Sequence, residues 1–161
     1  RDRYGFFRPT DEVFQAWKET KRIAQALRAR IVVFQCPASF DPSDEHKDNM
    51  RAFFGEIDRG DLTLAWEPRG EWKDEEIEAL CRELDLVHCV DPFGRLPVYG
   101  DLAYFRLHGI GGYHYEYTDE DLTQLMERCH QFVEVYCFFN NVSMWESASR
   151  FYQLLKVFEE R

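Results

Sequence analysis

Short apolar runs and amphipathic stretches alternate along almost the whole chain. The apolar runs predict β-strands at residues 31–34, 62–66, 86–90, 102–107 and 133–139. Apolar residues at helical spacing predict helices between these strands, and several of the helices follow a capping residue: Thr10, Ser43, Asp74 and Thr118. Strands that are apolar throughout and alternate with helices are typical of a parallel sheet covered by helices. The pattern therefore predicts an α/β fold.

Two architectures fit this alternation, an open doubly wound sheet and a closed (β/α) barrel. The glycine-rich phosphate loop of a dinucleotide-binding sheet is absent from this sequence. Every predicted strand instead ends in polar residues, as in a TIM barrel, whose functional face is built from strand ends. A complete barrel takes ~250 residues and eight strands, but this chain has 161 residues. We therefore expect residues 1–161 to form a single (β/α)-barrel-like domain, an incomplete barrel of about five parallel strands without its N-terminal units.

The charge and the cysteines narrow the classes of function. The formal net charge is −10, from 30 acidic and 20 basic side chains. The negative net charge disfavours broad binding of nucleic acid, which requires a positively charged surface. A local basic pocket could still bind a phosphate. No apolar run is long enough to span a membrane. The five cysteines fit neither a zinc site nor a disulfide framework, and reduced thiols predict a cytoplasmic protein.

Polar side chains at the predicted strand ends are the candidates for chemistry. Side chains alternate along a strand, so Glu67 and Arg69 share one face, as do Arg106 and His108. If these faces point inward, the mouth of the barrel gathers Gln35, Glu67, Arg69, Asp91, Arg106, His108 and Asn140. We expect the two arginines to clamp a phosphate or carboxylate, because a guanidinium binds such groups bidentately.

The remaining polar residues complete a predicted site. Glu67, His108 and Asp91 are the candidate catalytic residues, with Glu67 or His108 as general acid or base. The candidate ligand-binding residues are Gln35, Arg69, Arg106, Tyr115, Asn140 and Asn141. The alternating Tyr113, Tyr115 and Tyr117 predict either rings that stack on a sugar or base, or a hydrophobic cover for the barrel mouth.

Two alternatives remain open for the same residues. In the first, Glu67 and Asp91 each pair with one arginine and the barrel is plugged by structural ion pairs. Leaving one member of such a buried pair alone costs about 3–5 kcal/mol, so the charges must be matched by protein or by ligand. In the second, Glu67, Asp91 and His108 hold a divalent metal, although their local spacing does not indicate one. No cofactor is predicted.

Six short motifs occur in order, each after a predicted strand. They are Phe34-Gln35-Cys36-Pro37, Trp66-Glu67-Pro68-Arg69, Val90-Asp91-Pro92, Phe105-Arg106-Leu107-His108-Gly109, Tyr113-x-Tyr115-x-Tyr117 and Phe138-Phe139-Asn140-Asn141. This series resembles the Domain of Unknown Function 72 (YecE-like) family. The resemblance runs from about Phe6 to the C-terminus of this chain and corresponds to the C-terminal two-thirds of the family's domain. Family members usually have a double proline where Cys36-Pro37 stand, and an N-terminal Gly-Thr-Ser-Gly-Trp-like motif that this chain lacks. The resemblance implies the barrel fold, but no settled reaction.

Three functions are consistent with the sequence. The first is a barrel that binds or turns over a small anionic ligand, phosphorylated or sugar-like, at the C-terminal strand ends. The second is a metal-dependent nucleic-acid-processing barrel, suggested by analogy of fold. The third is a non-enzymatic binding or scaffold protein with a structural polar plug. An open sheet edge also predicts self-association, because long apolar edges pair with other chains.

Overall fold

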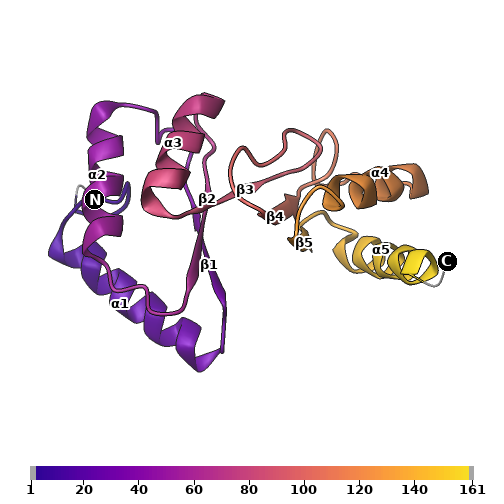
Figure 1. Cartoon of the computed structure of the whole chain (residues 1–161), viewed down its shortest axis with the longest axis horizontal. Coiled ribbons are helices and arrows are strands. Elements are labelled where there is room, and N and C mark those ends of the chain that lie inside the picture. The colour runs from indigo at the N-terminus through magenta and orange to yellow at the C-terminus, as the bar shows by residue number, and fades with distance from the viewer. Residues whose placement is uncertain (1–2, 160–161) are drawn as a thin grey trace. The chain divides into compact units, whose positions relative to one another are not determined.

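A computed structural model of the chain describes residues 3–159 (Figure 1). Its strands are β1 (Ile31–Gln35), β2 (Thr63–Glu67), β3 (Val87–Val90), β4 (Leu102–Leu107) and β5 (Glu134–Phe139). Its helices are α1 (Asp11–Ala26), α2 (Asp44–Glu56), α3 (Asp74–Leu84), α4 (Asp119–Cys129) and α5 (Met144–Glu159). All the predicted strands are present, with shifts of a residue or two at their ends. The predicted cap of α3 was wrong by one position, because Lys73 is the N-cap and its amide donates to Glu76 Oε2.

The strands are parallel and follow one another in sequence order, β1-β2-β3-β4-β5. A doubly wound sheet reverses its strand order part-way across, whereas a (β/α) barrel adds each strand beside the previous one. The observed order is therefore that of an incomplete (β/α)-barrel-like fold, and the predicted fold class is confirmed. No helix among residues 3–159 is long and apolar enough to cross a membrane.

The chain divides into two compact units, residues 1–88 and residues 89–161. The division falls inside β3, whose first half pairs with β2 and whose second half pairs with β4. Val87 and His88 lie opposite Ala65 and Trp66. Cys89 and Val90 lie opposite Tyr104 and Phe105. The prediction of one domain over residues 1–161 stays a prediction, and the two units are described separately.

The first unit has a core built mainly of aromatic rings. Phe34 of β1 packs between the Trp17 ring of α1 and the Phe53 and Phe54 rings of α2, with ring centroids 5.3 to 5.9 Å apart. Trp66 of β2 is fully buried and meets the Trp72 ring edge-on at 4.9 Å. Large rings bury much apolar area, so this cluster fixes α1 and α2 on β1.

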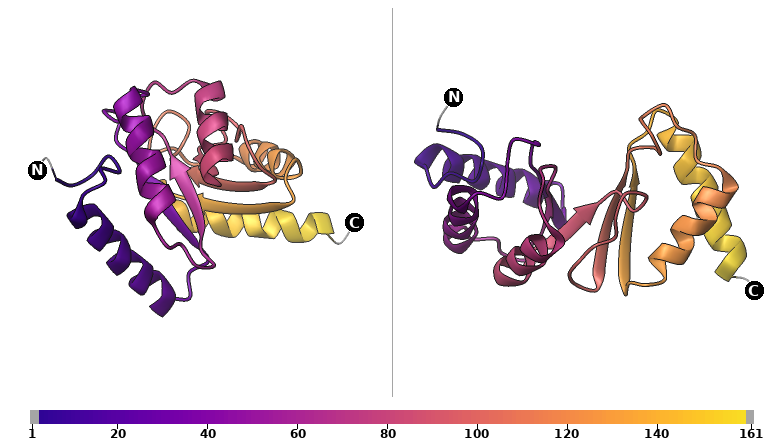
Figure 2. Two further views of the ribbon diagram at one scale, coloured as in Figure 1. Left: turned by 60° about the vertical axis from the view of Figure 1, so that its left-hand side comes forward. Right: turned by 90° about the horizontal axis from the view of Figure 1, so that it is seen from above.

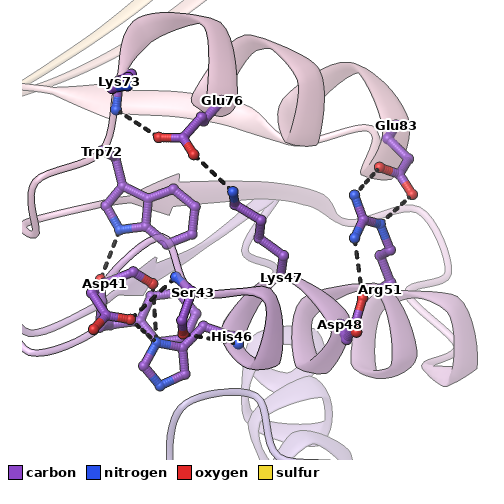
Figure 3. Close-up of polar contacts among 11 residues, drawn as sticks. Asp41, Ser43, His46, Lys47, Asp48, Arg51, Trp72, Lys73, Glu76 and Glu83 are labelled. Atoms are coloured by element: carbon purple, nitrogen blue, oxygen red, sulfur yellow. Dashed lines mark hydrogen bonds and ion pairs between the residues drawn. The ribbon is translucent and has the colours of Figure 1, made fainter.

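Helices α2 and α3 are also joined by polar contacts at the surface of the first unit (Figure 3). Lys47 Nζ donates to Glu76 Oε1 at 2.7 Å, and Arg51 Nε donates to Glu83 Oε1 at 2.8 Å. Below them, Trp72 Nε1 donates to the Phe40 carbonyl oxygen at 2.7 Å, which ties the loop after β2 to the loop after β1. These contacts hold the loop after β2, which contains Arg69 and follows directly on Glu67.

The second unit has α4 and α5 side by side on one face of β4 and β5 (Figure 2). The side chains of β4 alternate in burial, with Ala103, Phe105 and Leu107 fully buried against the helices. Tyr104 and Arg106 are half-buried and therefore project from the opposite face of the strand. This alternation determines which residues of the second unit are available to a site.

Candidate functional site

Glu67 and Arg69 form an ion pair at the end of β2, in the first unit. Arg69 donates to Glu67 Oε1 through Nη2 at 2.8 Å and through Nε at 3.0 Å. The Glu67 side chain is only 8% exposed, whereas that of Arg69 is 35% exposed. Glu67 is the last residue of β2, and Arg69 lies two residues beyond the end of the strand. Gly70 follows them because a Cβ at this position would lie 2.6 Å from the Phe40 carbonyl oxygen.

Gln35 is the residue of β1 that lies opposite Glu67 in the sheet register. It is exposed and contributes to the lining of a cavity of about 350 Å³ in the first unit. The walls of this cavity are mostly apolar and include the rings of Phe7, Trp17 and Phe34. Gln35 therefore lies beside Glu67 along the sheet and next to an apolar cavity.

Asp91 connects the ends of β3 and β4 in the second unit. Its Oδ2 accepts a hydrogen bond from the His108 amide at 2.9 Å, and its Oδ1 accepts one from the Phe93 amide at 3.0 Å. The His108 ring lies close to the same carboxylate, with Nδ1 3.6 Å from Oδ2. A carboxylate in this position orients the imidazole.

Arg106 and Asn140 meet at the ends of β4 and β5. In the amide orientation that satisfies both of its polar atoms, Asn140 accepts from Arg106 Nη2 at 2.9 Å and donates to the Phe138 carbonyl oxygen at 3.3 Å. The ladder between the two strands continues here, because the Asn140 amide donates to the Leu107 carbonyl oxygen at 2.7 Å. Together we call Asp91, Arg106, His108 and Asn140 the strand-end cluster.

The loop between β4 and α4 folds back over these strand ends. Gly109 has φ of +92° and donates its amide to the Tyr117 hydroxyl at 2.8 Å. The Tyr115 hydroxyl donates to Asp121 Oδ2 at 2.8 Å, and the Tyr115 carbonyl oxygen accepts from Asn141 Nδ2 at 2.9 Å. Burial raises the pKa of the Tyr117 hydroxyl, which keeps it protonated. The loop is thus held by several long-range hydrogen bonds.

The three alternating tyrosines do not form a stack. Tyr117 is buried, and Tyr115 meets it edge-on at 5.5 Å. Tyr113 is 52% exposed and contacts the His108 ring edge-on at 5.7 Å. Both predicted roles of these tyrosines, ligand stacking and hydrophobic cover, stay predictions, with Tyr113 as the exposed ring beside His108.

Comparison with known proteins gives a match that includes all of these strands and loops. A family model described as "Protein of unknown function DUF72" matches residues 6–161, which is nearly the whole chain. The chain belongs to the DUF72 family. The predicted resemblance is therefore confirmed.

A crystal structure of a DUF72 family protein from Enterococcus faecalis has a similar fold, with a TM-score of 0.68 at 19% sequence identity. The match covers 91% of this chain and 65% of that one, so this chain spans about two-thirds of the length of its structural relative. A search of curated proteins found no match.

The structure of this DUF72 chain brings some of the predicted residues together within each unit. In the first unit, Glu67 and Arg69 are in contact and Gln35 is the register neighbour of Glu67. In the second unit, Asp91 contacts His108, Arg106 contacts Asn140, and Asn141 contacts Tyr115. The predicted clamp of Arg69 and Arg106 joins residues of different units and stays a prediction. Within residues 3–159, no group of three His, Cys, Asp or Glu side chains is placed to hold a metal ion.

The sequence reasoning missed an aromatic face beside Arg106 in the DUF72 chain. Tyr104 of β4 stacks on Phe138 of β5 at 4.8 Å and on Tyr136 at 6.0 Å. Phe138 is 44% exposed. The signal was present in the alternation of the two strands, because Tyr104 and Arg106 share a face and so do Tyr136, Phe138 and Asn140.

Proposed function

We propose that this DUF72 protein binds a small anionic ligand, phosphorylated or sugar-like, at the strand-end cluster. The observation that carries the proposal is the contact between Arg106 Nη2 and the Asn140 side-chain oxygen, at 2.9 Å. This contact fixes the Arg106 guanidinium near the end of β4. A planar guanidinium has five N–H donors in a fixed fork, which matches the oxygens of a phosphate or carboxylate.

The surroundings of Arg106 support a ligand with both an anionic and a flat apolar part. Tyr104 and Phe138 present stacked rings on the same face, and Phe138 is partly exposed. Sugars and bases pack on such rings, while their phosphate or carboxylate groups bind arginine. On this basis we assign ligand-binding roles to Arg106 and Asn140, with Gln35, Arg69, Tyr115 and Asn141 as further candidates.

If the protein is an enzyme, His108 and Asp91 are the acid–base pair we propose in the second unit. The Asp91 carboxylate oxygen lies 3.6 Å from His108 Nδ1, close enough to orient the ring. Glu67 is the corresponding carboxyl group in the first unit, where it pairs with Arg69. General acid–base catalysis of this kind contributes typically 10²–10⁴-fold to a rate.

The test of the ligand site is a comparison of two arginine variants. Titration calorimetry with inorganic phosphate and with glucose 6-phosphate should give at least about tenfold weaker binding for Arg106→Gln, as expected from losing a charge-assisted hydrogen bond. Arg82→Gln is the matched control, because Arg82 is exposed and pairs with Glu78 along α3. Equal affinities for the wild type and Arg106→Gln, with both proteins folded by circular dichroism, would overturn the proposal.

A structural polar plug is the second candidate, and the Glu67–Arg69 pair favours it. Glu67 is nearly buried and already satisfied by a protein arginine rather than by a ligand. In that case Arg69→Gln should destabilise the protein by about 3–5 kcal/mol, the cost of leaving a buried partner alone. A loss below ~1 kcal/mol in urea unfolding would speak against the plug.

Two further proposals concern the cellular location of the protein and its self-association. All five cysteines, which lie within residues 3–159, are thiols rather than disulfides, and this supports a cytoplasmic location. In the described sheet β1 and β5 are the terminal strands, and this supports self-association through a sheet edge. Sedimentation of the full-length protein over a concentration series tests the second proposal, which a monomer at all concentrations would refute.

A further inference from the structure

Two cysteine side chains lie in contact within the second unit. Cys129 is the last residue of α4, and Cys137 lies in the middle of β5. Their sulfur atoms are 3.8 Å apart, and both residues are partly accessible to solvent. The connector between them reverses direction through hydrogen bonds from the Gln131 amide to the Arg128 carbonyl oxygen and from the Phe132 amide to that of Cys129. A thiol pair thus bridges a helix end and the sheet.

The remaining thiols of the chain differ from this pair in burial. Cys36, Cys81 and Cys89 are buried. Burial raises the pKa of Cys36 and of Cys81 to about 12, so both are protonated and inert at neutral pH. Cys129 differs because its sulfur is in contact with that of Cys137, and this contact lowers the pKa of Cys129 and raises that of Cys137. The thiolate of the pair therefore forms on Cys129.

We propose that Cys129 and Cys137 form an oxidisable dithiol, which hydroperoxides convert to an intramolecular disulfide. The site lies on the side of β5 that faces α4 and is independent of the anion site proposed above. Cys137 belongs to the helix-facing set of β5, with Val135 and Phe139, whereas Asn140 follows the opposite set.

The reaction proceeds in two steps. The Cys129 thiolate attacks one oxygen of the hydroperoxide, an S–O bond forms, the O–O bond breaks, and water or an alcohol leaves with the proton. Cys137 then attacks the sulfur of this sulfenic acid, the S–S bond forms, the S–O bond breaks, and the hydroxyl leaves as water with the Cys137 proton. The peroxide gains the two electrons that the two thiols lose. A dithiol reductant reverses the change by thiol–disulfide exchange.

The geometry requires only a short movement. The sulfur atoms must approach from 3.8 Å to the bond length of about 2.05 Å. Cys129 is at the end of its helix, where the backbone frays more readily than in a helix interior. The bond would tether the end of α4 to β5 and close a short loop through residues 130–136.

The test uses hydrogen peroxide on the reduced full-length protein, with free thiols then blocked by a maleimide and the digest analysed by mass spectrometry. The wild type should yield a peptide pair linked through Cys129 and Cys137, and dithiothreitol should abolish it. In Cys137→Ser, Cys129 should stop at the sulfenic acid and be labelled by dimedone. In Cys129→Ser the linked peptide pair should be absent, and Cys137 should react more slowly than Cys129 does in the wild type, because burial still raises the pKa of its thiol.

Cys89→Ser is the matched control and should oxidise like the wild type, because Cys89 is buried. Circular dichroism establishes that each variant is folded, and Cys129→Ala or Cys137→Ala replaces any serine variant that is not. Oxidation confined to other cysteines, disulfides only between molecules, or both thiols unchanged by excess peroxide would each overturn the proposal.

Discussion

The Asp91 carboxylate lies close to both the backbone amide and the imidazole ring of His108. Its Oδ2 lies 2.9 Å from the His108 amide nitrogen and 3.6 Å from His108 Nδ1. The backbone contact links the loop after β3 to the end of β4, because the same carboxylate also accepts from the Phe93 amide. The position of His108 therefore depends on Asp91, whichever ligand the strand-end cluster binds.

Replacing Asp91 tests this dependence. Asp91→Ala leaves two amides without their acceptors, and we expect a loss of about 1–3 kcal/mol in the free energy of unfolding. Asp91→Asn keeps one acceptor oxygen and should lose less. Urea unfolding followed by tryptophan fluorescence measures both variants. If Asp91→Ala were as stable as the wild type, the carboxylate would not organise these strand ends.

Substitution of Gly109 tests how much the loop that covers the strand ends contributes to stability. Its φ is +92°, and a Cβ at this position would lie 2.1 Å from the Gly112 carbonyl oxygen. We expect Gly109→Ala to lower the free energy of unfolding by about 1–3 kcal/mol, because the loop must distort and Tyr117 then loses its contact with the Gly109 amide.

Gly55 provides the matched control for Gly109. It lies in α2, and a Cβ there would meet no atom within 4 Å. Gly55→Ala should stabilise the protein by roughly 0.5–1 kcal/mol, since alanine restricts the unfolded chain and favours the helix. Equal effects of the two substitutions in urea unfolding would contradict this account of the loop.

His88 provides a pH-dependent test of the first unit. It is buried in β3, and burial lowers its pKa from the usual 6.5 to about 4. The unfolded chain therefore binds the proton more readily than the folded one. The stability that neutral His88 contributes is complete above pH 6.5 and is lost as the pH falls from 6.5 to about 4.

The measurement compares wild type with His88→Asn at two pH values. Between pH 7.5 and pH 5 the wild type should lose about 2 kcal/mol more of its unfolding free energy than the variant. The difference between the two proteins isolates His88 from the carboxyl groups, which titrate in both. Parallel losses in the two proteins would show that His88 is protonated in the folded state at pH 5.

The strands could be predicted from the sequence because burial on both faces makes them continuously apolar, and such runs are visible without coordinates. The shared face of Tyr104 and Arg106 on β4 could also be read from the sequence, since side chains alternate along a strand. The cap of α3 was misplaced, because Asp74 and Lys73 are neighbours and the decisive bond comes from Glu76.

The contacts across long stretches of chain could not be predicted in this way. Asp91 and the His108 amide are 17 residues apart, and Asn141 and the Tyr115 carbonyl are 26 apart. No periodicity connects such residues, because irregular loops bring them together. The burial of Tyr117 beneath its loop depends on the same contacts, so alternation alone could not distinguish it from the exposed Tyr113.

The shared strand β3 has a consequence for how the molecule opens. The β1–β2 register extends over Ile31 to Gln35 and the β4–β5 register over Leu102 to Leu107, whereas β3 aligns only two residues with each neighbour. The alignment of β3 with each neighbour is therefore shorter than that within either of the two ladders. Amide hydrogen exchange should then reveal two cooperatively opening blocks, with β3 exchanging before the ladders on either side. The short strand β3 would then mark the boundary between two segments of the chain that are protected from exchange independently of each other.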